Sequence, residues 1–227
     1  ILAGELPELP PRGDTSSDFY FFPADDDESA ADRLIDVVTR RIPSSFGFDW
    51  ARDVQVLSPM YKGACGVDAL NERLREALGI GGRQLVLRGR TWRVGDRVIH
   101  TRNDYERHVF NGDMGRIVRV HEDGTGLVVR FPERELPYTA TELTDLSPAF
   151  AITVHRSQGG EYPAVVVPLV DRHYTMLERH LLYTAVTRAK RLLVIVGSKR
   201  ALRRAVENSE VHGRESALRE RLEACLG

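Results

Sequence analysis

The sequence has few of the features of exported, disulfide-bonded or membrane-spanning proteins. Its two cysteines, Cys65 and Cys225, stand far apart and outside any CxxC pair, which excludes a disulfide framework and a zinc knuckle. The longest apolar run, residues 164–170, has the length of a strand, whereas a membrane-spanning helix needs about 20 apolar residues. We therefore expect a cytoplasmic protein with reduced cysteines and no membrane partner.

A phosphate-binding loop is also missing. The only lysines are Lys62, Lys190 and Lys199, and none lies in a Gly-x-x-x-x-Gly-Lys-Ser/Thr segment; that loop holds nucleotide phosphates on its backbone amides and its lysine. Residues 1–7 contain neither an initiating Met nor the basic start of a signal peptide. We expect that the chain cannot hydrolyse ATP by itself and that it begins within a longer protein.

The composition fits a soluble globular protein. A chain of 227 residues with 42% hydrophobic and 29% charged residues can form one α/β domain of ordinary size and a small second one. The formal net charge is -1, so overall charge gives no indication of nucleic-acid binding. Arginines gather over residues 179–204, but a solvated helix surface explains most clusters of this kind.

The order of the predicted elements indicates one domain interrupted by another. Residues 1–17 are typical of a connector. The next segments alternate between strand and helix: an aromatic strand at 19–22 ended by Pro23, a helix over 31–42 capped by Asp27 or Ser29 and stopped by Pro43 and Gly47, a strand at 54–57, and a helix over 67–78 closed by Gly79. The pattern returns with strands at 149–153, 164–170 and 192–197 and helices at 177–190, 199–208 and 216–225.

Residues 83–147 show a different pattern. Short β segments at 97–101, 115–121, 126–131 and 142–146 are separated by turns, among them a hairpin turn at Asp123-Gly124, which predicts a small antiparallel barrel. We therefore predict an α/β parallel sheet formed by residues 18–82 and 148–227, with a separable β barrel inserted at 83–147.

Two polar stretches stand where predicted elements end. Thr153 and His155 follow a buried strand and lie on one side if that strand continues, and Gln158, Gly159 and Glu161 lie on the turn beyond. Ligand sites of open α/β sheets gather at such strand ends, although a polar surface loop gives the same pattern. Arg188 lies near the end of the helix predicted at 177–190. Its planar guanidinium suits a transferring phosphate, but it could equally be a cation at a helix C-terminus.

Taken together, the stretches resemble the RecD-like branch of superfamily 1 DNA helicases, the exodeoxyribonuclease V alpha-subunit family. Residues 153–161 (Thr-Val-His-Arg-Ser-Gln-Gly-Gly-Glu) resemble motif V, and residues 183–189 (Tyr-Thr-Ala-Val-Thr-Arg-Ala) resemble motif VI. Residues 56–67 are similar to the motif IV region, and residues 95–115 to the start of the SH3-like insert of that branch. The four segments occur in the family's order and cover most of the chain.

The resemblance implies a role for each matched residue. Arg188 would be the arginine finger of a second RecA-like domain, and Gln158, Gly159 and Glu161 would face the nucleotide, with Glu161 on the ribose. Tyr61 stands where the family is often basic, and Lys62 is the only nearby cation that could contact a nucleotide phosphate from motif IV. The role of Tyr61 is open, since it could stack or simply pack. Single-stranded DNA would be contacted by these residues: Thr153, His155, Arg102 and Asn111.

We therefore expect the C-terminal half of an ATP-dependent 5′–3′ DNA helicase of DNA repair and recombination, with a RecA-like parallel sheet covered by helices on both faces and interrupted by an SH3-like barrel. ATP and Mg²⁺ would be held mainly by an N-terminal RecA-like domain of the same protein, and nuclease-complex subunits are further candidate partners. The alternatives are a DNA- or protein-binding module without ATP chemistry and the helicase portion of a conjugative relaxase. A pure binding module would not need Arg188, Gln158 and Glu161 together.

Overall fold

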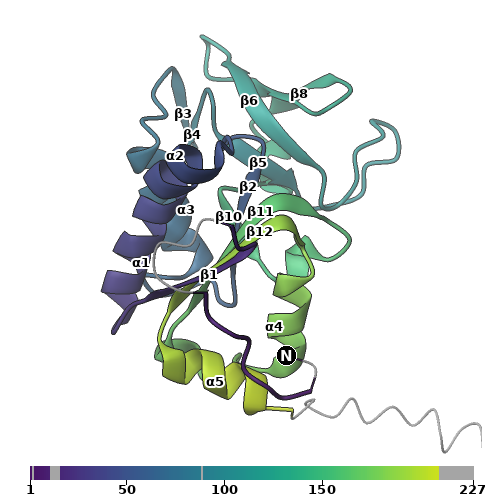
Figure 1. The fold of residues 1–227 in the computed structure, drawn as a ribbon. Helices are drawn as coiled ribbons and strands as arrows, with labels where there is room; N and C mark the ends of the chain where they lie inside the picture. The colour runs from purple at the N-terminus through teal and green to yellow at the C-terminus, as the bar shows by residue number, and fades with distance from the viewer. Residues whose placement is uncertain (2, 11–15, 88, 210–227) are drawn as a thin grey trace, which may run out of the picture.

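The computed structural model describes residues 1, 3–10, 16–87 and 89–209. Its larger sheet has five parallel strands in the order β1-β12-β11-β2-β10 (Figure 1). The strands are β1 (Phe19–Pro23), β2 (Val54–Ser58), β10 (Ala151–Thr153), β11 (Tyr162–Leu169) and β12 (Ala189–Gly197). All five were predicted, with ends that differ by up to three residues.

Alternating side chains of the strands bury both faces of this sheet. Ala164 and Val166 of β11 pack in one core with α1 (Asp27–Asp36) and α3 (Val67–Ala77). Val165 and Val167 pack in a second core with α4 (Arg179–Val186) and α5 (Lys199–Glu207). Because successive side chains of a strand point to opposite faces, the valine run of β11 serves both cores. The predicted sheet with helices on both faces is confirmed.

The first helical segment differs from the prediction at both ends. Its N-cap is Asp26, whose Oδ1 accepts a hydrogen bond from the Ser29 backbone N–H at 2.8 Å, while Ser29 Oγ lies 3.2 Å from the Asp26 N–H. The prediction of Asp27 or Ser29 as cap is therefore wrong. Pro43 does not stop the segment either: a π-helical turn, η1 (Val37–Arg41), leads into α2 (Ile42–Phe46), and Pro43 stands in its first turn, where no backbone N–H is required.

The remaining helix ends mostly follow the prediction. Gly47 ends α2 with a φ of 67°, and Gly79 follows α3 with a φ of 62°, a left-handed conformation that glycine adopts without steric cost. The helix predicted over 177–190 is shorter, since α4 ends at Val186. The helix predicted at 216–225 and Cys225 lie outside the described residues. No helix in the described part of the chain is long and apolar enough to cross a membrane.

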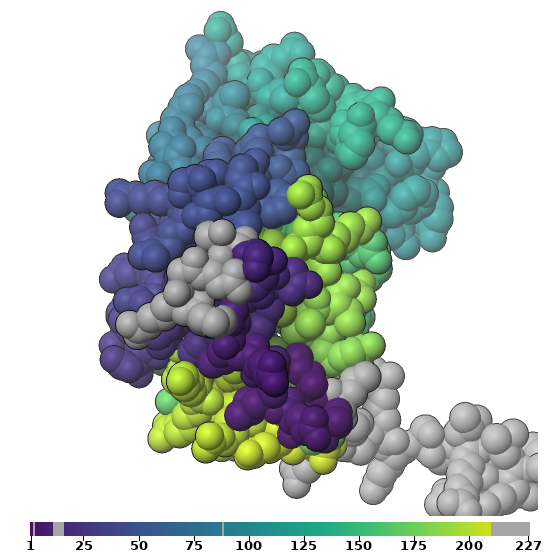
Figure 2. Space-filling view, in the orientation of Figure 1, coloured from purple at the N-terminus to yellow at the C-terminus, as the bar shows by residue number. Residues whose placement is uncertain are grey.

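The insert forms a second, antiparallel sheet in the order β8-β7-β6-β5-β9. Its strands are β5 (Arg97–His100), β6 (Met114–Val120), β7 (Gly126–Arg130), β8 (Glu135–Thr139) and β9 (Leu146–Pro148), and a hairpin of β3 (Gln84–Leu87) and β4 (Arg90–Arg93) precedes them. The turn at Asp123-Gly124 joins β6 to β7 as predicted. The strand predicted at 142–146 is wrong for its first part, because Glu142–Asp145 form a 3-10 turn. Figure 2 shows the insert at the opposite end of the molecule from α5.

The insert has its own core, but it is also tied to the parallel sheet. Trp92, Ile117, Leu127 and Tyr138 are among the buried residues of that core. In contrast, the buried Arg97 of β5 donates hydrogen bonds to the Val54 carbonyl at 2.7 Å, the Trp50 carbonyl at 3.2 Å and Gln55 Oε1 at 2.8 Å. Burial lowers the pKa of Arg97 to about 10, so the group stays charged at neutral pH.

A second buried ion pair links α3 to the insert. Arg75 of α3 donates to Asp96 at 2.9 Å, and both side chains are 1% exposed. Gln55 Nε2 donates in turn to the Ala149 and Phe150 carbonyls, which lead into β10. Removing residues 83–147 would take Arg97 from Gln55 Oε1 and Asp96 from Arg75, at a cost of about 1–3 kcal/mol for each of these groups that stays buried. These contacts argue against an insert that can be removed without loss of stability.

Arg97→Ala is expected to lower the free energy of unfolding by about 3–5 kcal/mol, because it leaves the buried Val54 carbonyl and Gln55 Oε1 without this donor and removes a partner of the half-buried Trp50 carbonyl. The matched control is Arg119→Ala on the same insert. Its side chain is 67% exposed, so its removal should change stability by about 0.5 kcal/mol or less. Urea unfolding of the native protein and the two variants measures both effects, and equal stability of the two variants would contradict this role of Arg97.

A candidate nucleic-acid groove and a second polar edge

A groove of about 640 Å³ runs between the carboxyl end of the parallel sheet and the insert. It is lined by residues of both bodies and of the loops between them: Pro59, Met60, Tyr61, Ile99, Asn111, Gly112, Thr153, His155, Arg156, Gln158, Thr175 and Met176. The structure thus brings together three of the four residues predicted to contact DNA, namely Thr153, His155 and Asn111. The fourth, Arg102, is exposed and lies 3.4 Å from Asp145, and it is not among the lining residues.

The turn after β10 aims these side chains. The strand ends at Thr153, whose Oγ1 accepts a hydrogen bond from the Arg156 backbone N–H at 3.2 Å. Residues His155–Ser157 then form a 3-10 turn, held by a 2.6 Å hydrogen bond from Ser157 Oγ to the Val154 carbonyl. The strand therefore does not continue to His155, yet both side chains line the groove. Gln158, predicted to face the nucleotide, lines the same groove.

The segment 154–161 carries the chain from one end of the sheet to the other. In the sheet, Thr153 of β10 is paired with Ser58 of β2, and Ala164 of β11 is paired with Val54 of β2. The first residue of β11, Tyr162, therefore lies six residues from the position level with Ser58, toward the amino end of the sheet. At a rise of about 3.3 Å per residue this is roughly 20 Å. Gly159 makes the bend with a φ of 84°, which an L side chain rarely adopts. A single short segment therefore joins the groove to the amino end of β11.

A second polar cluster lies at that amino end. Arg188 donates to the Gly160 carbonyl at 3.0 Å, to the Thr184 carbonyl at 3.2 Å and to Thr187 Oγ1 at 3.2 Å. Beside it, Glu161 forms an ion pair with Lys190 at 2.8 Å. The hydrogen bond and charge of Lys190 lower the pKa of Glu161. Arg188, Glu161 and the backbone of Gly160 are therefore gathered at one edge of the parallel sheet.

Sequence reasoning gave no role to Lys190, and the structure places Lys62 away from Arg188. Lys190 stands two residues after Arg188 at the start of β12, and this spacing was the available signal. Lys62 follows the carboxyl end of β2, so it lies at the opposite end of the sheet from Arg188. The structure therefore does not bring Lys62 to the edge where Arg188, Glu161 and Lys190 lie.

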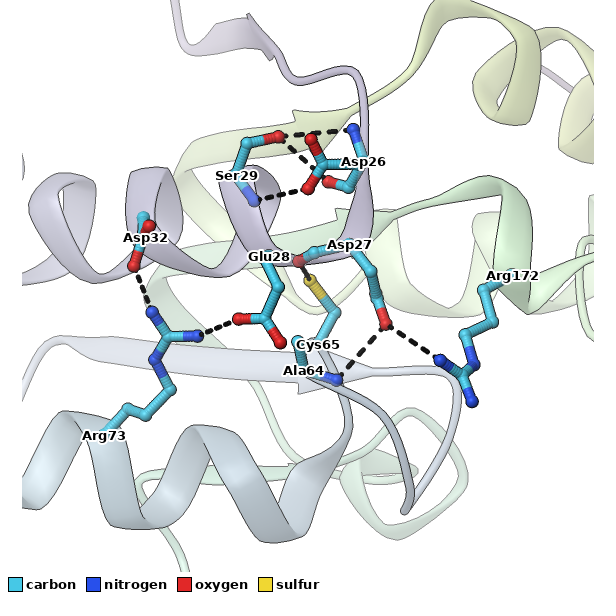
Figure 3. Close-up of polar contacts among 9 residues, drawn as sticks. All are labelled: Asp26, Asp27, Glu28, Ser29, Asp32, Ala64, Cys65, Arg73 and Arg172. Atoms are coloured by element: carbon cyan, nitrogen blue, oxygen red, sulfur yellow. Dashed lines mark hydrogen bonds and ion pairs between the residues drawn. The ribbon is translucent and has the colours of Figure 1, made fainter.

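The loop that carries Tyr61 and Lys62 is held by the start of α1 (Figure 3). Asp27 Oδ2 accepts a hydrogen bond from the Ala64 N–H at 3.2 Å, and the Cys65 thiol donates to the Asp27 carbonyl at 3.3 Å. Burial, followed by the nearby Asp27 charge, raises the pKa of Cys65, which leaves it an unreactive thiol. Below the loop, Arg73 of α3 pairs with Glu28 and Asp32 of α1. The loop is therefore fixed rather than freely exposed.

Tyr61 projects from this loop with 47% of its surface exposed. The Arg156 guanidinium lies 5.9 Å from its ring centroid. An exposed ring beside an arginine is a surface on which a nucleobase can stack. Sequence reasoning left the role of Tyr61 open and did not single out Arg156, because the contact joins residues far apart in the chain.

Comparisons with known proteins agree with this arrangement. Residues 148–196 match the UvrD-like helicase C-terminal domain, and residues 70–131 match the ATP-dependent RecD-like DNA helicase SH3 domain. The chain is 38% identical over 171 residues to the ATP-dependent RecD2 DNA helicase of Deinococcus radiodurans, which covers 75% of this chain and 24% of that protein. It is 38% identical over 133 residues to the RecBCD enzyme subunit RecD of Mycobacterium tuberculosis, covering 59% of this chain and 23% of that one.

A solved structure shares the fold. The Pif1 helicase from Bacteroides, in complex with ADP-AlF3 and ssDNA, superposes with a TM-score of 0.50 at 18% identity, over 85% of this chain and 49% of that chain. The two domain matches define a helicase C-terminal domain that carries an SH3 insert of the RecD-like kind. The chain belongs to the RecD-like DNA helicases, as a C-terminal part of one. It spans about a quarter of the length of the two curated relatives.

A buried histidine beside the groove makes stability depend on pH. His173, 1% exposed, follows β11, and burial lowers its pKa from 6.5 to about 4, only partly opposed by the charge of Asp27. The folded-state pKa is thus below the unfolded one, so the unfolded chain binds a proton first. The contribution of His173 should be complete above about pH 6.5 and should fall as the pH drops toward 4, by roughly 3 kcal/mol at about 1.4 kcal/mol per unit.

His173→Gln should remove this dependence while keeping a polar side chain at the position. The measurement is the free energy of unfolding between pH 7 and pH 4 for both proteins, which share every other titrating group. Converging profiles as the pH falls are expected. Parallel profiles would show that His173 does not carry the effect.

Proposed function

We propose that this chain is the second motor domain of an ATP-dependent DNA helicase. In this proposal the groove holds single-stranded DNA and the edge at Arg188 closes on a nucleotide held by an N-terminal RecA-like domain. The observation that carries the proposal is the pair of polar sites at opposite ends of the sheet, joined by residues 154–161. A displacement of Gly160 at one end of this short segment can therefore be passed along the backbone to Thr153 at the other.

In the groove, the side chains of Thr153, His155 and Asn111 can donate hydrogen bonds to phosphates, and Tyr61 with Arg156 offers a stacking surface. Contacts of this kind hold the backbone and tolerate any sequence, as a translocase needs. The SH3-like insert supplies Asn111, so the groove exists only where the two sheets meet. We extend the DNA contact to Arg102 on family resemblance alone.

At the edge, Arg188 would stabilise charge on the transferring phosphoryl group, and Glu161 would accept a hydrogen bond from the ribose. Arg188 is occupied by three oxygen acceptors, so we infer that nucleotide competes for it with the Gly160 carbonyl. Bound ATP with Mg²⁺ would supply the energy of movement. The described residues contain no group of three metal-ligating side chains, and we assign Mg²⁺ to no residue of this chain.

The direction of movement, 5′ to 3′, and work within a nuclease complex are further parts of the proposal, supported by likeness to relatives named RecD2 and RecD. The alternatives, a binding module without ATP chemistry or a relaxase portion, are less favoured. A binding module has no use for the cluster of Arg188, Glu161 and Lys190, and the matches are to helicases.

Thr153→Ala and His155→Ala in the intact helicase should each weaken single-stranded DNA binding by about 10- to 100-fold, because each removes a hydrogen bond to a charged phosphate. The effect should be equal for oligothymidylate and oligoadenylate. Thr153→Ser, which keeps the hydroxyl, is the matched control and should bind nearly normally. Fluorescence anisotropy measures all four proteins. Normal binding by both alanine variants would exclude this groove as the DNA site.

Arg188→Ala and Arg188→Lys in the intact helicase should lower kcat for ATP by about 10³–10⁵-fold, because an ammonium lacks the planar fork of donors. If Arg188 were only a cation at the end of α4, its removal would cost about 1 kcal/mol of stability or less and leave turnover nearly intact. Arg191→Ala, an exposed neighbour stacked on Phe48, controls for the change in charge. Measured kcat and Tm separate the two roles, and a normal kcat in either Arg188 variant rules out the finger.

A further inference from the structure

A second hollow, of about 780 Å³, lies on the surface of α5 and of the loop after β11. It is lined by Asp171, Tyr174, Arg200, Arg203, Arg204, Glu207 and Asn208. We propose that this hollow binds the continuation of the single strand that occupies the groove. The inference rests on the proposed function and adds a binding site to it.

The arginines stand on a firmly held helix. The inner face of α5 is buried through Ala201, Leu202, Ala205 and Val206, which leaves Arg203 and Arg204 on its exposed face. Ser198 caps the start of the helix, and Arg179 donates to the Val206 carbonyl at 2.7 Å near its end. Figure 2 shows α5 at the surface of the molecule, at the end opposite to the insert. The cationic side chains therefore project from a fixed support.

An exposed aromatic ring completes the hollow. Tyr174 is 58% exposed, and the Arg204 guanidinium lies 5.8 Å from its ring centroid. This repeats the arrangement of Tyr61 and Arg156 in the groove, where the distance is 5.9 Å. An arginine beside an open ring face offers one group for a phosphate and one for a base.

The charge of the hollow is partly uncompensated. Arg200 pairs with Asp171 at 3.0 Å, whereas Arg203 has no ion pair or hydrogen bond within the described part of the chain. Arg172, which is not among the lining residues, is paired with Asp27 at 4.0 Å. Exposed arginines and a tyrosine ring fit a ligand that has both negative charges and flat apolar faces. A single-stranded nucleic acid has both, in its phosphates and its bases.

The hollow and the groove are neighbours on one loop. Tyr174 lines the hollow, and the next two residues, Thr175 and Met176, line the groove. The loop is held in place, since the Met176 N–H donates to the His173 carbonyl at 2.7 Å and Asn208 Nδ2 donates to the Leu177 carbonyl at 3.1 Å. A strand that leaves the groove over Thr175 therefore meets Tyr174 and then the arginines of α5.

The test is a length series of oligothymidylates, bound by the intact helicase with its other domain present. The variants are Tyr174→Ala and Arg203→Ala/Arg204→Ala. The matched control is Arg33→Ala/Arg40→Ala, which removes two exposed arginines from the helical segment that covers the other face of the sheet. Tyr174→Phe keeps the ring and should behave as the native protein does.

The affinity of the native helicase should keep rising as the oligothymidylate becomes longer than the groove. The Tyr174→Ala and Arg203→Ala/Arg204→Ala variants should lack this rise but should bind the shortest oligonucleotides as the native protein does. Tyr174→Ala should weaken binding of long oligonucleotides by about 5- to 150-fold, the range for one stacked base. The double arginine variant should lower the slope of log affinity against log salt by about 0.7 for each phosphate that the two arginines neutralise in the native complex.

Equal affinity of native and variant proteins at every length would overturn the proposal. So would a decrease no greater than that of the Arg33→Ala/Arg40→Ala control, because it would reflect only the overall charge. Failure of the native helicase to bind even the shortest oligonucleotides would instead contradict the proposed function of the groove. The two failures are therefore distinguishable.

Discussion

The buried guanidinium of Arg97 holds the two sheets of this protein together. It comes from the first strand of the antiparallel sheet and reaches three acceptors on or beside β2. Burying a charge costs several kcal/mol unless its donors are satisfied, so the two sheets are strongly constrained to this relative placement. The groove exists because of this placement, since one of its walls carries Asn111 from the insert and the other carries Thr153 and His155 from the end of the parallel sheet.

The same constraint gives the segment 154–161 its significance. With the groove fixed at one end of the sheet, and Arg188 held on the Gly160 carbonyl at the other, the segment has a defined position at each end. If nucleotide draws Arg188 away from Gly160, the segment is released at that end while its first turn keeps the hydrogen bonds at Val154 and Thr153. In this account the segment 154–161 links the nucleotide to the DNA. Only one of its contacts, the hydrogen bond between the Gly160 carbonyl and Arg188, has to be exchanged when the nucleotide binds.

The sequence predicted the parallel sheet well, because the alternating burial of the valine runs and the helix faces are local patterns. It also singled out Thr153, His155 and Asn111, from polar residues at strand ends and from family resemblance, and the structure brings the three to one groove; their contact with DNA stays a prediction. It missed Asp26 as the helix cap and the 3-10 turn at 142–145, where several residue types suit both outcomes. Arg97 could not be foreseen, since in the pattern Arg-Val-Ile-His it stands where a surface residue of a strand usually stands.

The side that Gln158 faces was equally hidden. Gln158 follows the 3-10 turn His155–Ser157, and the residue-by-residue alternation of a strand no longer applies in such a turn. Lys62 was grouped with the nucleotide site on resemblance, and only the direction of β2 shows that it stands at the other end of the sheet. Long-range contacts and turn geometry therefore account for most of what sequence reasoning lacked.

The most direct test of the central claim is a structure of the intact helicase with an oligothymidylate and a transition-state analogue of ATP hydrolysis. We expect phosphates within hydrogen-bond distance of Thr153 and Asn111. We also expect that the Arg188 guanidinium leaves the Gly160 carbonyl for the analogue. Nucleic acid bound away from the groove, or Arg188 still on Gly160 beside a bound analogue, would contradict the claim.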